Sequence, residues 1–97
     1  MAVAILFDIL YFMYYVYFIK SINKKFSYVG YTDNLERRFK EHNTAKVLST
    51  KSYAPFKLIY YEAYSNKKDA VLREHLLKHH GSVIGHLKRR IKYSLES

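Results

Sequence analysis

Glu74 stands out among the charged residues because a helical pattern surrounds it with apolar neighbours. It lies four residues after Ala70 and three before Leu77 in the stretch NKKDAVLREHLLKHH, so a helix would place its carboxylate on or beside the buried face. A carboxylate in that position costs free energy unless it meets a cation. Glu74 is therefore a candidate metal ligand, and an ion pair with Lys78 at i+4 is the structural alternative.

Arg38 and His42 form a second candidate group, because they are spaced four residues apart in TDNLERRFKEHN. A helix brings two such residues onto one face. The planar guanidinium of an arginine can contact two phosphate oxygens at once, and a histidine beside it can exchange a proton near neutral pH. The structural alternatives are a surface ion pair between Arg38 and Glu41, and a histidine favoured by the negative end of the helix dipole.

Two tyrosine-bearing tripeptides, YVY and YVG, lie on neighbouring apolar runs and are separated by ten residues. Side chains alternate between the two faces of a strand, so Tyr17 shares a face with Tyr15, and Tyr28 shares one with Gly30. The chain has 11 tyrosines, and most tyrosines on strands belong to a core or to a sheet surface. Gly30 is typical of a bend, or of a place where another backbone or a ligand comes close.

The strands that must position these tyrosines are predicted by composition. Runs rich in aromatic and β-branched residues predict strands at 14–19, 26–31 and 57–64. The polar segment SINKK separates the first two runs and predicts an antiparallel hairpin.

The helices are predicted by apolar periodicity and by capping patterns. Asp33 stands three residues before Glu36, and Asn66 stands three residues before Asp69, as at helix starts. The predicted helices are 32–43, 66–80 and 82–97. The segment 44–56, with mixed polarity and the only proline, predicts a loop over the surface. The order β-β-α-β-α-α indicates an α+β domain with a small three-stranded antiparallel sheet flanked by helices.

The composition limits the class of protein and of partner. The 97 residues include no cysteine, which excludes disulfides, thiolate zinc sites and a cysteine nucleophile and favours an intracellular, cytoplasmic protein. The net charge is +9, and all 17 lysines and arginines lie from Lys20 onward. This distribution favours an anionic polymer such as nucleic acid, with a solvated ribosome-like face or a membrane-surface face as alternatives.

Three histidines, His75, His79 and His80, suggest a zinc-binding group at first sight. Zinc sites add cysteines or carboxylates at matching positions, and no such set accompanies these histidines in the sequence. We therefore predict exposed histidines near the end of a helix.

Residues 1–19 are almost entirely apolar, and their number is sufficient for a membrane span. Asp8 interrupts the run, no basic residue precedes it, as a signal peptide would require, and its last third belongs to the first predicted strand. We therefore expect no membrane partner, and we divide the chain into an apolar extension at 1–12 and a domain at 13–97. The extension is either sequence upstream of a natural start at Met13, or an added strand or helix that covers the sheet.

The order and spacing of these elements resemble the GIY-YIG nuclease superfamily, which is named after two tripeptides on adjacent strands. The resemblance covers about residues 14–91, and it is greatest to small single-domain members that are likened to the nuclease domain of the ABC excinuclease. The segments that carry it are YVY, YVG, NLERRFKEHN, STK with PFKLIYYEAY, and DAVLREHLLK.

The resemblance implies a metal-dependent endonuclease that hydrolyses DNA phosphodiester bonds, with duplex, branched or flapped DNA as substrate and a role in repair or recombination. It implies one divalent cation, Mg²⁺ or Mn²⁺, held by Glu74. A recruiting protein partner and the oligomeric state are left open. The residues to which the resemblance assigns catalysis are Tyr17, Tyr28, Arg38, His42 and Glu74.

Two departures from the family pattern keep a second interpretation open. The excinuclease branch often has lysine directly after the glycine of the second tripeptide, where this chain has Tyr31, and a late asparagine has no match in GSVIGHLKRR. Another basic residue such as Lys51 would then have to neutralise the phosphate. The alternatives are a nucleic-acid-binding module of the same fold with weak or no turnover and, from charge and aromatic content alone, an RNA-binding or ribosome-associated protein.

Overall fold

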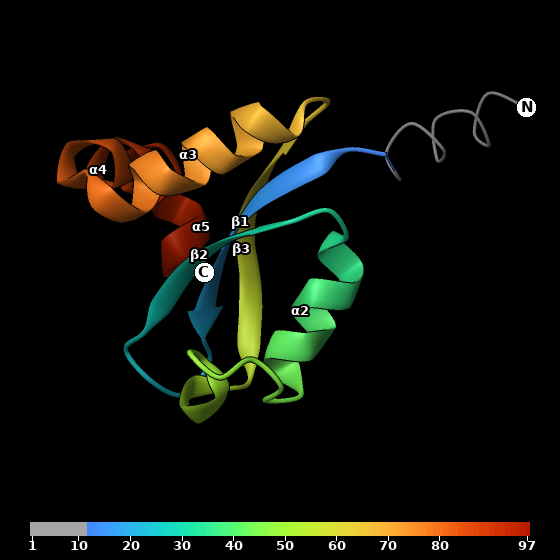
Figure 1. Cartoon of the computed structure of the whole chain (residues 1–97). Coiled ribbons are helices and arrows are strands. Elements are labelled where there is room, and N and C mark those ends of the chain that lie inside the picture. The colour runs from blue at the N-terminus through green and yellow to red at the C-terminus, as the bar shows by residue number, and fades with distance from the viewer. Residues whose placement is uncertain (1–11) are drawn as a thin grey trace, which may run out of the picture.

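Three strands form an antiparallel sheet at the centre of this computed structural model, which describes residues 12–97 (Figure 1). β1 spans Tyr14–Ser21, β2 spans Ser27–Thr32 and β3 spans Phe56–Tyr64. The order across the sheet is β2-β1-β3. Each predicted strand is found within two residues at either end, so the α+β class with a three-stranded antiparallel sheet is confirmed.

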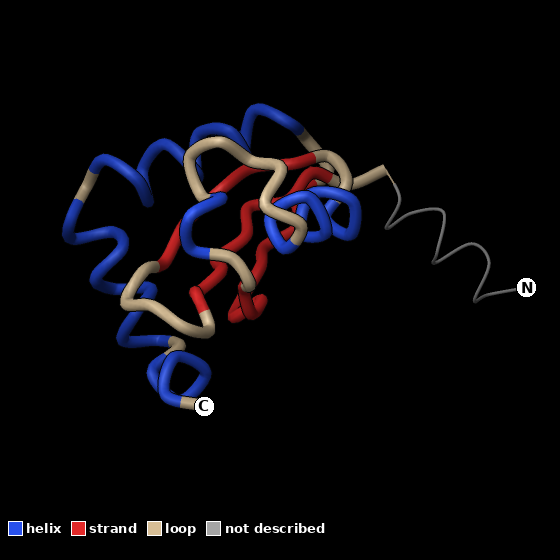
Figure 2. The backbone as a smooth tube through the Cα atoms, turned by 90° about the horizontal axis from the view of Figure 1, so that it is seen from below, coloured by secondary structure: helices blue, strands red, loops and turns tan. Residues whose placement is uncertain are grey.

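The central strand β1 is buried on both faces. Val16 and Phe18 point into one apolar core, and Tyr17 and Ile19 point into another, as the alternation of a strand requires. The first core is closed by the C-terminal helices and the second by the helix that follows β2. Figures 1 and 2 show these helices on opposite sides of the sheet.

The helix α2 spans Leu35–Asn43 and packs on the Tyr17 face. Asp33 was the predicted start, but the cap is Asn34, whose side chain accepts a hydrogen bond from the Arg37 amide at 3.1 Å. Asp33 instead forms an exposed ion pair with Arg37. The helix therefore begins one residue later than its sequence pattern suggested.

The helices α3 (Lys67–His79), α4 (Gly81–Arg90) and α5 (Lys92–Glu96) cover the other face. Asn66 caps α3 as predicted. The single helix predicted at 82–97 is wrong, because the chain leaves helical geometry at Ile91 (φ −109°, ψ 29°). Ile91 and Leu95 nevertheless both pack in the apolar core.

The segment 44–56 is mostly exposed, as its polarity predicted, but it is also anchored in the core. Val47 and Thr50 are buried, and Lys51–Tyr53 form a short 3₁₀ turn, η1. Asn43 helps to hold the segment in place, because its side chain accepts a hydrogen bond from the Phe56 amide at 2.6 Å. The buried polar atoms of this segment thus have partners within the fold.

The apolar extension predicted at 1–12 lies outside the described residues except for Phe12, which is exposed. Within residues 12–97, no helix combines the length and the apolar character that crossing a bilayer would require.

Glu62 links β3 to α3 through a half-buried polar network. Its carboxylate accepts hydrogen bonds from Arg73 at 2.9 and 3.0 Å, from the Tyr60 hydroxyl at 2.6 Å and from the Tyr64 hydroxyl. Burial alone would raise the pKa of Glu62, but the bonds from Arg73 and the two tyrosines lower it below its usual value.

We predict that Glu62→Gln lowers the free energy of unfolding at pH 7 by about 1–3 kcal/mol, because charged hydrogen bonds to Arg73 are lost. Since the folded-state pKa is depressed, this stabilisation is present above the unfolded pKa near 4.5 and disappears as the pH falls through the folded pKa. Urea denaturation of the parent and the variant across this range measures it. A difference that stays constant down to pH 3 would contradict the prediction.

Candidate active site

Tyr17 and His42 form a buried hydrogen-bonded pair between β1 and α2. Their exposed fractions are 1% and 0%, and the Tyr17 hydroxyl lies 2.7 Å from His42 Nε2. The other ring nitrogen, Nδ1, lies 2.7 Å from Thr50 Oγ1. The imidazole is therefore held on both sides by hydroxyl groups in a site that excludes water.

Both members of the pair are uncharged near neutral pH. Burial raises the pKa of Tyr17 to about 12, while the neighbouring Arg38 guanidinium acts in the opposite direction. Burial and the positive charge of Arg38 lower the pKa of His42 to about 4. Burial thus disfavours both the tyrosinate form of Tyr17 and the imidazolium form of His42.

Gly30 makes room for the Tyr17 ring. The two residues are paired across β1 and β2, and a Cβ atom at Gly30 would overlap the Tyr17 hydroxyl and lie 2.8 Å from Cε1. The close approach anticipated at this glycine is thus made by a side chain of the neighbouring strand. Any larger residue would push Tyr17 away from His42.

Tyr28 completes the aromatic part of the site. It lies two residues before Gly30 and is half-buried, with its ring centroid 6.5 Å from that of Tyr17 and 5.4 Å from that of His42. The two tyrosines of the tripeptides therefore lie against the same imidazole.

Arg38 lies one helical turn before His42 and beside the Tyr17 hydroxyl. Its Nη1 donates a hydrogen bond to Glu41 Oε1 at 3.2 Å, and about 35% of its side chain is exposed. The ion pair that was the structural alternative is therefore present. It leaves part of the guanidinium facing solvent next to the buried pair, where a phosphate can approach.

Glu74 enters from α3, on the other side of β2. Its side chain is 24% exposed, and Oε2 lies 3.5 Å from Lys78 Nζ. The same ammonium lies 3.4 Å from the Tyr28 hydroxyl and 4.6 Å from the centre of the Tyr28 ring. Glu74 also helps to raise the pKa of Tyr17, so the carboxylate acts on the buried pair across the sheet.

The five predicted residues are thus linked through Tyr28, which lies against Tyr17 and His42 on one side and against Lys78, the ion-pair partner of Glu74, on the other. Lys78 joins them. We call Tyr17, Tyr28, Arg38, His42, Thr50, Glu74 and Lys78 the candidate site. Its charges are mixed, with Arg38 and Lys78 on opposite sides of the tyrosines and Glu74 next to Lys78.

The donor set suits a hard cation better than zinc. Among residues 12–97, no three His, Cys, Asp or Glu side chains are arranged to hold a metal ion. Glu74 already meets a cation, the Lys78 ammonium, so positive charge fits here. One carboxylate with water and phosphate oxygens matches the coordination habit of Mg²⁺. His75, His79 and His80 are exposed, as predicted.

Two members of the candidate site were missed by the sequence reasoning. Thr50 lies in a segment with no periodicity that would place it, and only its contact with His42 identifies it. The i+4 spacing of Glu74 and Lys78 predicted their ion pair, but no sequence pattern indicated the contact between Lys78 and Tyr28. Lys51, the other basic residue considered for the phosphate, is exposed on η1.

Comparison with known proteins agrees with this geometry. The GIY-YIG catalytic domain family matches residues 13–83, which include every residue of the candidate site. A UPF0213 protein of Clostridium perfringens is 40% identical over 67 residues, covering 68% of this chain and 71% of the relative. UPF0213 proteins of Limosilactobacillus reuteri (41% over 69 residues, covering 68% and 71%) and Haloquadratum walsbyi (33% over 66 residues, covering 67% and 73%) are also similar.

We predict that Gly30→Ala destabilises the fold by about 1–3 kcal/mol, because the added methyl group overpacks a buried ring that is tied to His42. Gly81→Ala is the matched control, since a Cβ at that position meets nothing within 4 Å. Chemical denaturation of the three proteins measures the effect. Equal stability of the two variants would show that Tyr17 can move without cost.

Proposed function

This chain belongs to the GIY-YIG nuclease superfamily, and from that membership we propose that it is an endonuclease that hydrolyses DNA phosphodiester bonds with one divalent cation. We infer a branched or flapped DNA substrate and a role in repair or recombination. The proposal rests on one observation, which is that a buried Tyr17–His42 pair lies beside Arg38, with Glu74 linked to it through Lys78 and Tyr28.

Arg38 and Lys78 provide the positive charge that a phosphodiester requires. As water attacks, negative charge grows on the oxygens of the phosphorus atom, and fixed donors stabilise it. Arg38 offers two parallel donors from a partly exposed guanidinium. Lys78 lies on the other side of Tyr28. The excinuclease branch often has a lysine at the position of Tyr31. Lys78 takes over the neutralisation of the phosphate that such a lysine would provide.

The Tyr17–His42 pair receives the proton of the attacking water. In the tautomer with hydrogen on Nδ1, His42 donates to Thr50 Oγ1, and its Nε2 accepts from the Tyr17 hydroxyl. The Tyr17 oxygen then takes a proton from a water molecule that has to enter this buried site with the phosphate, while its own proton passes to His42 Nε2 and leaves an imidazolium. Burial raises the pKa of Tyr17 to about 12 and lowers that of His42 to about 4, so the negative charge of the bound phosphate has to stabilise the imidazolium that the relay leaves. Tyr28 positions the water or the phosphate through its hydroxyl.

Glu74 is the residue that would hold Mg²⁺ or Mn²⁺ in this proposal. The ion would supply charge for the phosphate and for the departing 3′ oxygen. Within the protein, Glu74 has to release Lys78 when another cation binds, and Lys78 is then available to the phosphate.

A binding module of the same fold is the second candidate function. It is favoured by the Glu74–Lys78 ion pair, which satisfies the carboxylate without a metal, and by the presence of Tyr31 where the excinuclease branch often has lysine. The two functions differ in one measurable respect, which is divalent-dependent nicking of DNA.

We predict that Glu74→Gln abolishes metal-dependent cleavage and leaves DNA binding almost intact, because the change removes a charge and preserves volume. The loss should be on the order of 100-fold or more. Nicking of a flapped DNA with Mg²⁺, Mn²⁺ or EDTA measures turnover, and calorimetry measures Mn²⁺ binding. Glu96→Gln, at the exposed end of α5, is the control. If Glu74→Gln binds Mn²⁺ as the parent does, Glu74 is not the ligand.

We predict that Arg38→Lys reduces turnover nearly as much as Arg38→Ala, on the order of 100-fold, because lysine lacks the two-donor geometry. The neighbouring exchange Arg37→Lys should have little effect, since Arg37 makes only an exposed ion pair with Asp33 of a kind worth at most about 1 kcal/mol. Single-turnover rates on one flapped substrate compare the variants. An Arg38→Lys rate within about threefold of the parent would rule out a specific transition-state contact.

A further inference from the structure

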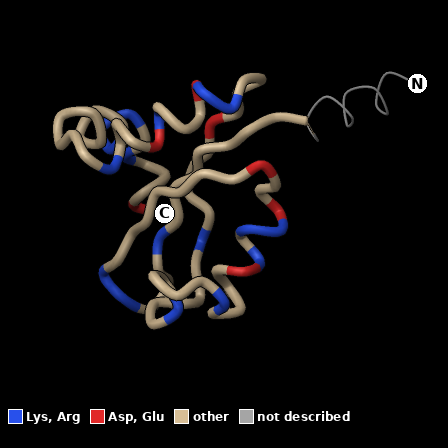
Figure 3. Tube along the Cα trace, viewed as in Figure 1, with Lys and Arg blue, Asp and Glu red and all other residues tan. Residues whose placement is uncertain are grey.

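Two lysine-bearing segments lie side by side at one end of the molecule. The β1–β2 turn, residues 20–26 (KSINKKF), has three lysines and no acidic residue, and so does the segment 43–57 that leads into β3. Figure 3 shows blue without red along both, at the lower end of the view, whereas the red segments lie along α2, at the upper end and next to the C-terminus.

Specific contacts hold the two segments together. The Ser21 hydroxyl donates to the Tyr53 carbonyl at 2.6 Å, the Ile22 amide donates to the Pro55 carbonyl at 3.0 Å, and Lys24 Nζ donates to the Ser52 carbonyl at 2.7 Å. Phe26 stacks on Tyr53 with centroids 3.8 Å apart. The lysines are thus attached to a fixed surface rather than to independent loops.

This surface is directly continuous with the candidate site. Lys51 follows Thr50, which lies 2.7 Å from His42 Nδ1. Phe26, on the other segment, lies two residues before Tyr28. Both lysine-bearing segments are therefore joined directly to residues of the candidate site.

We propose that Lys24, Lys25, Lys46 and Lys51, here called the lysine surface, bind the sugar-phosphate backbone of the DNA next to the bond that is cut. The inference rests on the proposed function and names the substrate-binding surface for it. Four exposed ammonium groups with no acidic neighbour in their own segments match a row of phosphates, to which lysine binds as a point charge. An acidic protein would be the other partner for such a charge.

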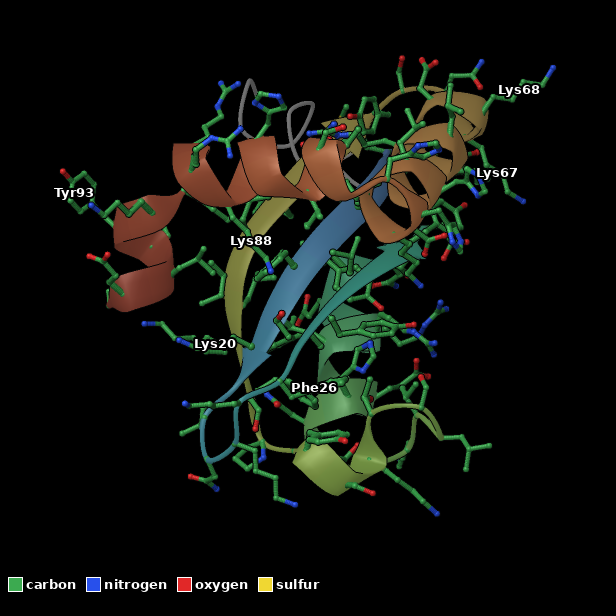
Figure 4. All side chains as sticks on the ribbon, turned by 90° about the vertical axis from the view of Figure 1, so that its left-hand side faces the viewer. Lys20, Phe26, Lys67, Lys68, Lys88 and Tyr93 are labelled. Atoms are coloured by element: carbon green, nitrogen blue, oxygen red, sulfur yellow. The ribbon has the colours of Figure 1, made fainter. Side chains whose placement is uncertain are left out.

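The test compares two double variants with the same change in charge. Lys25→Gln/Lys51→Gln alters the lysine surface but keeps Lys24 and its bond to Ser52. Lys67→Gln/Lys68→Gln is the control, since both lysines are exposed in the first turn of α3. Figure 4 shows Lys67 and Lys68 at one end of the molecule and Phe26 toward the other.

Binding of a fluorescent flapped DNA is measured in EDTA, so that no cleavage occurs, over a series of salt concentrations. We expect the slope of log Kd against log salt to fall by about 1 for each lost phosphate contact, so by about 2 for Lys25→Gln/Lys51→Gln. The control should keep the parent slope. Thermal denaturation of each protein establishes that the variants are folded.

Equal slopes for the parent and Lys25→Gln/Lys51→Gln overturn the lysine surface, and so does a control variant that loses as much slope. The outcome is separate from that of the nuclease proposal. If the slope falls for Lys25→Gln/Lys51→Gln but the parent cuts no DNA, the lysine surface is part of a binding module. If the parent cuts DNA but the slope is unchanged in that variant, the nuclease proposal stands and the lysine surface is rejected.

Discussion

The hydrogen bond between Tyr17 and His42 is the contact around which this site is built. It joins the central strand to α2 inside an apolar core, where an unpaired hydroxyl or imidazole would be costly. Gly30 leaves space for the ring and Thr50 satisfies the second ring nitrogen. Stability and chemistry therefore require the same geometry, because the arrangement that satisfies the buried polar atoms also positions a proton relay.

The sheet places opposite charges on two sides of that relay. α2 brings Arg38 from one face, and α3 brings Glu74 and Lys78 from the other, where Lys78 reaches Tyr28 of β2. Burial keeps Tyr17 and His42 uncharged, while the charged groups stay at the edge that solvent and phosphate can reach. Such a division avoids a buried unpaired charge and still provides positive potential where a phosphodiester would bind.

The Glu74–Lys78 ion pair can be interpreted either as an ordinary surface interaction or as part of the candidate site. In a helix, the i+4 spacing is sufficient to explain the pair as a modest surface interaction. The third group, Tyr28, changes this view, because the ammonium lies between a carboxylate and the hydroxyl of a tyrosine that belongs to the candidate site. Lys78 thus connects α3 to the tyrosines of the sheet, and it does so from a position where it can exchange partners.

The sequence by itself determined the strands, the cap at Asn66, the shared helical face of Arg38 and His42, and the unusual position of Glu74, because all of these follow from local periodicity and spacing. Only the tertiary structure decided which groups meet. Thr50 was hidden in a segment without periodicity, the contact of Lys78 with Tyr28 joins residues 50 positions apart in sequence, and the helix break at Ile91 interrupts an apolar stripe that continues through it. Contacts between distant segments depend on packing and on the satisfaction of buried polar atoms, and a local pattern contains neither.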